Sequence, residues 1–307
     1  MAKYFAATGI PTVDLGVKGG TEIGDLHELG RLAREIGSAF CSNGCAFLIN
    51  HGIDEDMLSE VIAAKKEFFA LKEDVKMQYL SLPGTLFGYL PFNMARYDQN
   101  THDIHEGFII VSEEEDNLPS GLVPPLLPAV TKAMSSFRTL SFKIMSALSL
   151  AIGQEQDYLT KMHQEFVAKK GFSCLRVNHF PPMTSDQPPN AIRFGAHRDN
   201  GTITLLATGD EGGLQVCSAD GAWIDVPPNN LLLMAGQFLH FYSHKKFIAP
   251  LHRVLLPEKV RYGIPRFSVI FFVCPDTHIP LKPPCSDEPD PPTWMDYYSA
   301  QVKGVLA

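Results

Sequence analysis

Residues 202–227, TITLLATGDEGGLQVCSADGAWIDVP, decide the fold. They contain three short apolar segments, 202–209, 213–218 and 222–227, which glycine- and aspartate-rich turns separate. Branched and apolar residues recur at every second position of the first segment, and this period predicts a β-strand. Connections this short predict antiparallel neighbours, because parallel strands need a long crossover.

Further segments of the same kind lie on both sides of this stretch. They are residues 173–180, 230–243, 251–257 and 266–274. Short strands with frequent turns are typical of antiparallel sandwiches and barrels, and the absence of helical patterns between them excludes parallel βαβ units. The sequence therefore predicts a mainly β protein with flanking α-helices, whose core is a double-stranded β-helix, or jelly roll.

Helical patterns surround this predicted core. Apolar residues at helical spacing predict helices over residues 25–44, 54–80, 124–153, 156–166 and 290–307, with a short strand over 45–53 and an irregular segment over 80–105. We expect one domain over residues 1–307. Its parts would be an N-terminal helical layer (1–95), a jelly-roll core with packed helices (96–280) and a C-terminal helix (281–307).

Composition narrows the class of function. The formal net charge is −8 and no run of Lys or Arg is present, which argues against nucleic-acid binding and favours a small-molecule substrate. No apolar run approaches the length of a membrane span, so we expect a cytoplasmic monomer with no membrane partner. The six cysteines show no metal-binding spacing and are expected to be reduced.

A candidate metal site lies just before the strand that is predicted within residues 202–209. His197 and Asp199 are two residues apart, so on an extended chain both side chains point to the same side. His252, in a later strand, is the best third ligand, and His240 with His244 are weaker rivals in a predicted extended stretch. Two histidines and one carboxylate form the facial triad of non-haem Fe(II) oxygenases, although zinc hydrolases use the same ligand types. A turn with a capping aspartate is the simpler alternative.

A candidate anion site lies in the last predicted strand. Arg266 and Ser268 share one face of that strand, and a guanidinium beside a hydroxyl matches a carboxylate. Inside an apolar barrel such an arginine requires an anionic partner. Arg261, a few residues earlier, is expected to be an ordinary surface arginine.

Taken together, these motifs resemble the Fe(II)- and 2-oxoglutarate-dependent oxygenases related to isopenicillin N synthase, whose signature is HxD, a distal His and then RxS. The matching stretches are IPTVDL (10–15), GCAFLINHGI (44–53), LRVNHFPP (175–182), HRDNGTITLL (197–206), GGLQV (212–216), GAWIDVPP (221–228), HRV (252–254) and RFSVIFFVCPD (266–276). The resemblance implies Fe(II) bound by His197, Asp199 and His252. It also implies 2-oxoglutarate and O₂ as co-substrates, with Arg266, Ser268 and Asn178 binding 2-oxoglutarate.

Three departures from the family pattern bear on that site. Relatives commonly have NYYPP where this chain has NHFPP (178–182), so Phe180 replaces a tyrosine that would contact the co-substrate. The interval between His252 and Arg266 is longer than usual. Asn200 replaces an aromatic residue that often follows the aspartate.

The resemblance implies oxidation of an unactivated C–H bond of a small molecule, by hydroxylation, desaturation or ring closure, in specialised-metabolite biosynthesis. Candidate substrate contacts are Phe87, Tyr89, Asn93, Arg96, Tyr97, Phe108, His179 and Arg198. If Arg96, Arg198 and His179 face the cavity, a carboxylate-bearing, amino-acid-like substrate is favoured. Two alternatives remain open: an oxidase that uses no 2-oxoglutarate, and a non-catalytic jelly-roll binding protein.

Overall fold

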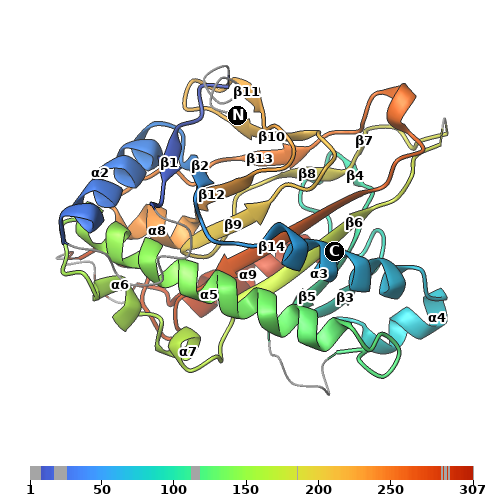
Figure 1. Cartoon of the computed structure of the whole chain (residues 1–307), viewed down its shortest axis with the longest axis horizontal. Helices are drawn as coiled ribbons and strands as arrows, with labels where there is room; N and C mark the ends of the chain where they lie inside the picture. Colours follow the sequence, from blue (N-terminus) through green and yellow to red (C-terminus); the bar gives the residue numbers. More distant parts are fainter. Residues whose placement is uncertain are drawn as a thin grey trace.

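The computed structural model describes residues 8–16, 26–111, 118–184, 186–284, 286, 289 and 291–306. The described residues fold into two large β-sheets and a small sheet of two strands, with helices packed around them (Figure 1). The strands are β1 (Thr12–Asp14), β2 (Cys45–Ile49), β3 (Gly88–Leu90), β4 (His102–Asp103), β5 (Glu106–Ile110), β6 (Cys174–Phe180), β7 (Ala191–Ile192), β8 (Phe194–His197), β9 (Ile203–Ala207), β10 (Leu214–Cys217), β11 (Trp223–Asp225), β12 (Leu231–Ala235), β13 (His252–Val254) and β14 (Arg266–Val273). The helices are α2 (Leu26–Ser42), α3 (Glu55–Phe69), α4 (Glu73–Lys76), α5 (Leu126–Ala151), α6 (Tyr158–Lys161), α7 (Gln164–Val167), α8 (Gln237–Tyr242) and α9 (Trp294–Val305).

The larger sheet has the order β1-β2-β12-β9-β14-β6-β5-β3, and the smaller sheet has the order β11-β10-β13-β8. All pairs within these sheets are antiparallel except β1 with β2. The predicted jelly roll is thereby confirmed. The two earliest strands, β1 and β2, belong to the larger sheet, so the N-terminal segment contributes to the barrel as well as to the helical layer.

The period-two alternation of the strands divides the core into two parts. On β14, Val269 and Phe271 pack against the helices, while Arg266, Ser268 and Ile270 point between the sheets. Strands β6 and β9 alternate in the same way. The interior of the barrel is thus a narrow space with polar groups, and the main apolar core lies between the larger sheet and α2, α3 and α5.

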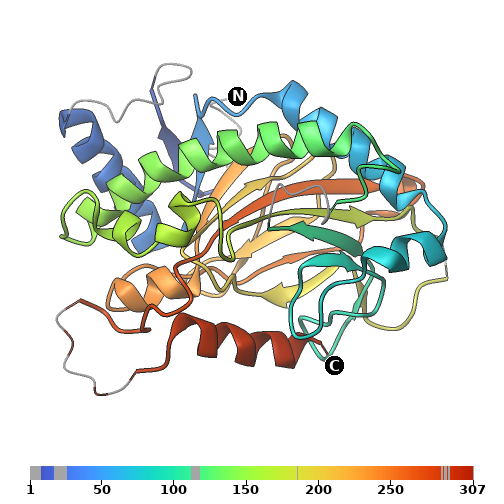
Figure 2. The same cartoon turned by 90° about the horizontal axis from the view of Figure 1, so that it is seen from below.

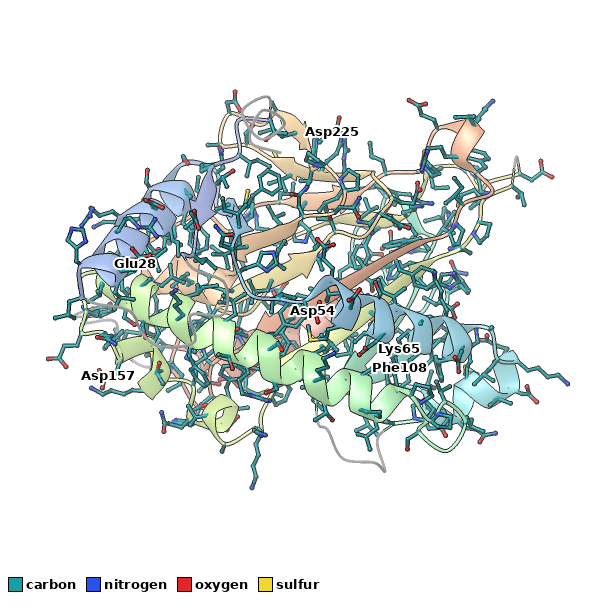
Figure 3. All side chains as sticks on the ribbon, viewed as in Figure 1. Glu28, Asp54, Lys65, Phe108, Asp157 and Asp225 are labelled. Atoms are coloured by element: carbon teal, nitrogen blue, oxygen red, sulfur yellow. The ribbon has the colours of Figure 1, made fainter. Side chains whose placement is uncertain are left out.

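The helices occupy both sides of the barrel. Figure 2 shows α5 along one side and α9, near the C-terminus, on the other. On the α3 side, Lys65 of α3 lies over the ring of Phe108 of β5, at the boundary between helix and sheet (Figure 3). No helix in the described part of the chain is long and apolar enough to cross a membrane.

Three sequence predictions were wrong in detail. The predicted helix over 54–80 breaks after α3, because Lys72 adopts an extended ψ of 148° before α4 begins. The predicted helix over 156–166 divides into α6 and α7, since His163 leaves the helical region with φ −127° and ψ 40°. The predicted strand over 230–243 ends at Ala235, and α8 follows.

The third error has a steric reason. A Cβ atom on Gly236 would meet the carbonyl oxygen of Gly201, so the chain approaches closely here and turns into a helix. The segment called irregular, 80–105, contains the short strands β3 and β4, and β5 follows it directly. The five described cysteines are free, as expected, and Cys285 lies outside the described residues.

Candidate active site

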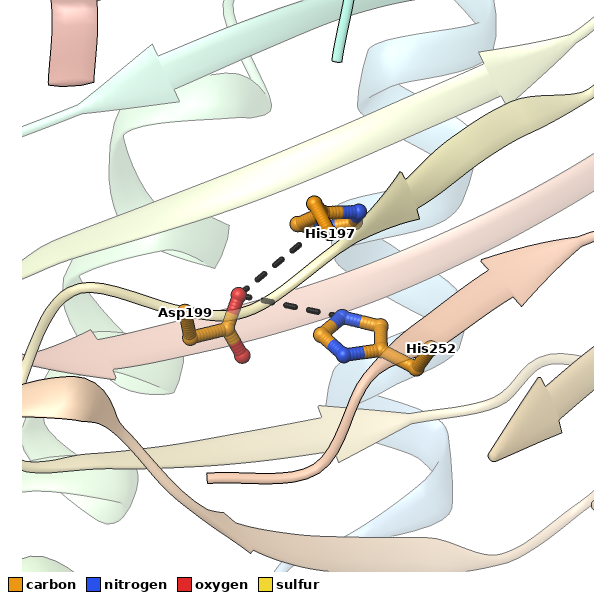
Figure 4. Close-up of side chains that lie close together, drawn as sticks. All are labelled: His197, Asp199 and His252. Atoms are coloured by element: carbon orange, nitrogen blue, oxygen red, sulfur yellow. Dashed lines mark ion pairs between the residues drawn. The ribbon is translucent and has the colours of Figure 1, made fainter. Parts of the chain in front are cut away.

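His197, Asp199 and His252 come together between the two sheets. His197 ends β8, Asp199 lies in the loop that follows, and His252 begins β13 opposite His197. Asp199 Oδ1 lies 3.7 Å from His197 Nε2 and 3.7 Å from His252 Nε2 (Figure 4). Among the described residues, these three are the one group whose ligand atoms all lie within 4.8 Å of one another.

Backbone carbonyls fix both imidazole rings. His197 Nδ1 donates a hydrogen bond to the carbonyl of Gly195 (2.9 Å), and His252 Nδ1 donates to that of Pro250 (3.2 Å). Each Nε2 is therefore left unprotonated and free to bind a metal. Burial, followed by the nearby His252, holds the pKa of His197 well below its usual value, which keeps the imidazole neutral as metal binding requires.

Hydrogen bonds also orient the carboxylate of Asp199. Thr204 Oγ1 on β9 donates to Asp199 Oδ2 at 2.6 Å, which leaves Oδ1 to face the two histidines. The backbone N–H of Gln237, at the start of α8, donates to the Asp199 carbonyl at 2.8 Å. Two histidines and one carboxylate, with no fourth His, Cys, Asp or Glu joining them among the described residues, suit Fe(II) bound with open positions.

A narrow cavity of about 30 Å³ leads from the three ligands to Arg266 at the other end. Arg266 is only 1% exposed, and its Nε and Nη2 donate to the carbonyls of Glu211 (3.0 Å) and Thr208 (2.9 Å). Its Nη1 has no hydrogen-bond partner among the described residues. Burial and the neighbouring Arg193 lower the pKa of Arg266 to about 9, so the site strongly favours an anion.

The residues beside Arg266 also line this cavity. Ser268 on β14 is paired with Asn178 on β6, and both side chains are buried there. The ring of Phe180 lies 5.1 Å from the Arg266 guanidinium and 5.9 Å from that of Arg193. The interior fits a small carboxylate held by the free Nη1 of Arg266 and the hydroxyl of Ser268. In this chain Phe180 contributes no hydroxyl there.

A second, larger cavity of about 320 Å³ opens on the other side of His197 and Asp199. Of the predicted substrate residues, Phe87, Tyr97 and Arg198 line it. Arg198 also donates from Nη1 to the carbonyl of Ala249. Most other walls are apolar or aromatic, as expected for a small-molecule site.

The other five predicted substrate residues do not line this cavity, and each has a physical reason. Asn93 is exposed in a turn with φ 63°, and Arg96 contacts the end of α9 through its backbone N–H, which donates to the carbonyl of Val305. Phe108 is buried beneath Lys65. Tyr89 and His179 belong to a separate buried cluster described next.

That cluster is centred on Glu106. Its carboxylate accepts from Tyr89 (2.6 Å), from His179 Nδ1 (2.8 Å) and from Lys76 Nζ (2.8 Å). Burial raises the pKa of Glu106, but the hydrogen bonds from His179, Lys76 and Tyr89 outweigh this effect and lower the pKa. His179 also stacks on the rings of Phe69 of α3 and Phe267 of β14, so it helps to pack α3 against the larger sheet.

The rival ligands are also accounted for. His240 lies on α8 and its Nδ1 bonds to the carbonyl of Phe247, while His244 occupies a turn with φ 53°. The extended stretch that was predicted to hold them is absent, and neither belongs to the group of three potential ligands that the described residues bring together. Arg261 is half exposed and pairs with Glu211, as expected for a surface arginine.

Sequence reasoning missed two parts of the larger cavity. The first is Arg176 on β6, which lines both cavities. The second is α9, which contributes Trp294, Tyr297, Tyr298, Gln301, Val302 and Val305. Arg176 had one available signal, because it is two residues from Asn178 and so shares its face of the strand.

The jelly roll, the facial triad and the buried arginine together define a mononuclear non-haem iron oxygenase. Comparison with known families agrees. The model of the 2OG-Fe(II) oxygenase superfamily matches residues 171–275, and the model described as non-haem dioxygenase in morphine synthesis N-terminal matches residues 10–128. The chain belongs to the 2OG-Fe(II) oxygenase superfamily.

Curated relatives and solved structures are consistent with this assignment. Azadirone synthase LFS of Melia azedarach is 29% identical, with 90% of this chain and 87% of that protein covered. Gibberellin 20 oxidase 2 of Oryza sativa is 27% identical, covering 92% of this chain and 71% of the relative. A putative 2OG-Fe(II) oxygenase of Caulobacter crescentus is 25% identical, with a TM-score of 0.79 and coverage of 97% and 99%.

A full-length Neurospora crassa protein, solved in complex with alpha-KG, shares the fold. Its TM-score is 0.81 at 24% identity, and 96% of each chain is covered. The protein is thus a dioxygenase that uses Fe(II), bound by His197, Asp199 and His252, with 2-oxoglutarate and O₂ as co-substrates. The cofactor prediction is confirmed, and the interpretation as a non-catalytic binding protein is wrong.

Proposed function

We propose that this enzyme oxidises an unactivated C–H bond of a small molecule in a pathway of specialised metabolism. The observation that carries the proposal is the cavity of about 320 Å³, lined mostly by apolar side chains and bounded by His197 and Asp199. Fe(II) with 2-oxoglutarate and O₂ supplies the chemistry that removes hydrogen from carbon, with succinate and CO₂ as co-products. The chain's contribution is to bind, orient and shield the substrate.

The names of the relatives support the substrate class. They include gibberellin oxidases, azadirone synthase and the leucoanthocyanidin dioxygenase of Perilla frutescens, all named for small molecules. None is more than 29% identical to this chain among those named here, so the prime substrate is a proposal at the level of class. Hydroxylation, desaturation and ring closure all begin with removal of hydrogen from carbon.

We further propose that Arg266, Ser268 and Asn178 bind 2-oxoglutarate. The support is the unpartnered Nη1 of Arg266, together with Ser268 and Asn178 as further polar residues that line the same narrow cavity. In this arrangement Arg266 and Ser268 would hold the distal carboxylate. Asn178 lies nearer to Arg176, from which it accepts a hydrogen bond.

The chain is proposed to act as one cytoplasmic, monomeric domain made of residues 1–95, 96–280 and 281–307. Helix α9 supports this arrangement, because it lines the same cavity as strands β6, β8 and β14. Sedimentation of the pure protein tests the oligomeric state.

The proposed reaction is tested by supplying Fe(II), 2-oxoglutarate and O₂ with a panel of small metabolites. Succinate is measured together with the product mass. We expect succinate release that rises with one class of substrate, and a product that gains one oxygen atom or loses two hydrogen atoms. Arg266→Met should abolish this release, whereas Arg261→Met, which removes a surface arginine, should retain it. Substrate oxidation without consumption of 2-oxoglutarate would contradict the proposal and favour the oxidase alternative.

A further inference from the structure

Arg176 is a buried cation placed between the two cavities. It lies on the inward face of β6, is 4% exposed and lines both spaces. Its Nε donates to Asn178 Oδ1 (2.5 Å), its Nη1 to the hydroxyl of Tyr97 (2.7 Å) and its Nη2 to His105 Nε2 (3.1 Å). None of these partners carries a negative charge, and the rings of Tyr97 and Phe194, 5.6 and 5.0 Å from the guanidinium, are also uncharged.

The acceptor on His105 is a neutral imidazole. Burial, followed by the neighbouring Arg176, holds the pKa of His105 well below its usual value. A protonated ring could not accept from the guanidinium. The pair is therefore a cation hydrogen-bonded to a neutral acceptor, and it supplies no counter-charge.

The charged residues that line the larger cavity are few. They are Arg176, Arg198 and Asp199. Asp199 is a ligand of the iron and accepts a further hydrogen bond from Thr204, while Arg198 is bonded to a backbone carbonyl. The described part of the chain thus provides no carboxylate for Arg176, although an unpaired buried charge is strongly unfavourable.

The guanidinium still has donors to offer. Arginine carries five N–H groups, and the three hydrogen bonds above leave one on each terminal nitrogen. A carboxylate accepts two such hydrogen bonds from a planar guanidinium, as a phosphate also does, and of the two the carboxylate is the smaller. The two unused N–H groups of Arg176 therefore match one carboxylate at the point where the two cavities meet.

The chain leaves space for this arrangement. Gly107, on the neighbouring strand β5, lies directly beside the Arg176 side chain. A Cβ atom at Gly107 would lie 3.2 Å from Asn178 Oδ1 and 3.5 Å from Nε and Nη2 of Arg176. Beyond the guanidinium the cavity walls are largely aromatic, with Phe172 in edge contact with Trp294 and Tyr298.

We propose that Arg176 binds the carboxylate of the prime substrate, with the hydroxyl of Tyr97 beside it. The substrate class is a small carboxylic acid with an apolar or aromatic body, whose body extends toward α9. Anchoring the acid at Arg176 fixes which carbon faces the iron, so this residue sets both affinity and the site of oxidation. The inference rests on the proposed function and deepens it.

The test measures binding rather than turnover. The protein is loaded with Mn(II), which does not support oxidation, and with 2-oxoglutarate, and is titrated by calorimetry with phenylacetate and with its neutral isostere phenylacetamide. We expect the wild type to bind phenylacetate more tightly by about tenfold or more, as a charge-assisted pair predicts. Arg176→Gln should bring the two affinities to within about twofold of each other, because the charge is lost but much of the shape is kept.

Two further variants separate recognition from folding. Arg176→Lys keeps the charge without the planar fork and should restore part of the preference for the acid. Arg253→Gln is the matched control, since Arg253 lies on the outward face of β13, where it bonds to Gln215 and covers Trp223. This control should retain the whole preference.

Each outcome has a definite meaning. Wild-type protein that binds both probes equally, or neither, overturns the proposal, as does Arg176→Gln protein that keeps the preference. A loss of 2-oxoglutarate affinity as large as the loss of phenylacetate affinity overturns it in favour of a co-substrate role. The proposed function fails separately, if the wild type with Fe(II) and 2-oxoglutarate shows no visible charge-transfer band without oxygen.

Discussion

Lys65 is a buried lysine that lines neither of the two cavities at the candidate active site. It lies on α3 with 0% of its surface exposed, and its Nζ is 3.5 Å from the centre of the Phe108 ring (Figure 3). Within the described residues Nζ has no hydrogen-bond partner. Burial lowers the pKa of Lys65 well below its usual value. We predict that Lys65→Met stabilises the protein.

The magnitude follows from proton linkage. A lysine whose pKa is lowered in the folded state must give up its proton on folding. The cost is ~1.4 kcal/mol for each pH unit below the unfolded pKa of ~10.4. It is counted down to the folded pKa, or down to the working pH where the working pH is higher. At pH 7 the limit is about 4–5 kcal/mol. The ring of Phe108 stabilises the protonated amine by about 1–2 kcal/mol and so raises the folded pKa, which holds the cost below this limit. Methionine fills a similar volume without an amine, so we expect a gain of about 3 kcal/mol.

The sign of the pH dependence is fixed by the same argument. The unfolded chain binds more protons at Lys65 than the folded chain does, so wild-type stability rises with pH up to ~10.4. The advantage of Lys65→Met should therefore shrink by up to ~1.4 kcal/mol for each pH unit above neutrality. Urea unfolding of both proteins at pH 7 and pH 9, followed by circular dichroism, measures this difference.

Lys66→Met is the control, because Lys66 is the next residue on α3 but is exposed to solvent. It should change the free energy of unfolding by no more than about 0.5 kcal/mol. The reasoning is refuted if Lys65→Met is no more stable than wild type. It is equally refuted if the gain is the same at both pH values, because the effect would then have no connection with a proton.

Three further outcomes are expected. Arg266→Met should weaken 2-oxoglutarate binding by about 100-fold, since a charge-assisted pair in a buried site contributes about 3 kcal/mol; an anaerobic titration of the Fe(II) protein measures it, and an unchanged Kd would exclude Arg266 from the co-substrate site. Thr204→Val removes the hydrogen bond to Asp199 and should weaken Mn(II) binding by about tenfold, measured by calorimetry. An unchanged affinity would mean that the carboxylate is oriented without this hydrogen bond. Glu106→Gln removes the buried carboxylate partner of Lys76 and leaves it only the exposed carboxylate of Glu73, so it should destabilise the fold by about 3 kcal/mol in urea unfolding. Because the pKa of Glu106 is lowered in the folded state, this deficit should shrink as pH falls below ~4.3 through the folded pKa, and a deficit that grows on acidification would contradict the assignment.

The metal ligands could be predicted because their spacing has one geometric meaning. Residues two apart on an extended chain share a side, and this places His197 and Asp199 together whatever the rest of the fold does. His252 could be predicted only from its position in a later strand of the same barrel. Its pairing opposite His197 depends on long-range register, which the local sequence does not contain.

The same period shows why one of the predicted substrate residues, His179, does not line the larger cavity. Asn178 and His179 are adjacent on β6, so they point to opposite faces of the strand and cannot both face the site. His179 in fact packs toward α3, against Phe69 and Phe267. Arg176 was overlooked because an arginine in a strand usually marks a solvent-facing position, and only the two-sheet arrangement turns that face inward.

Contacts between distant segments could not be predicted from local patterns at all. Helix α9 was expected from its sequence, yet nothing in residues 290–307 indicates that its side chains close the substrate cavity. The strand predicted through residues 236–243 was wrong for a similar reason. Gly236 approaches the carbonyl of Gly201, and this contact between segments far apart in the chain directs the backbone into α8.

The two faces of the larger sheet thus have different roles. Substitutions on the outward face should change stability, and those on the inward face should change ligand binding. On β14 the outward residues Val269 and Phe271 pack against the helices, so their loss would be felt as a loss of stability. Among the inward residues, Arg266 keeps one guanidinium nitrogen, Nη1, without a partner in the described part of the chain, and Ser268 lines the same narrow cavity. Buried polar groups without partners weaken a fold when no ligand is present. We therefore expect Arg266 to reduce the stability of the ligand-free protein, and the proposed binding of 2-oxoglutarate to restore it.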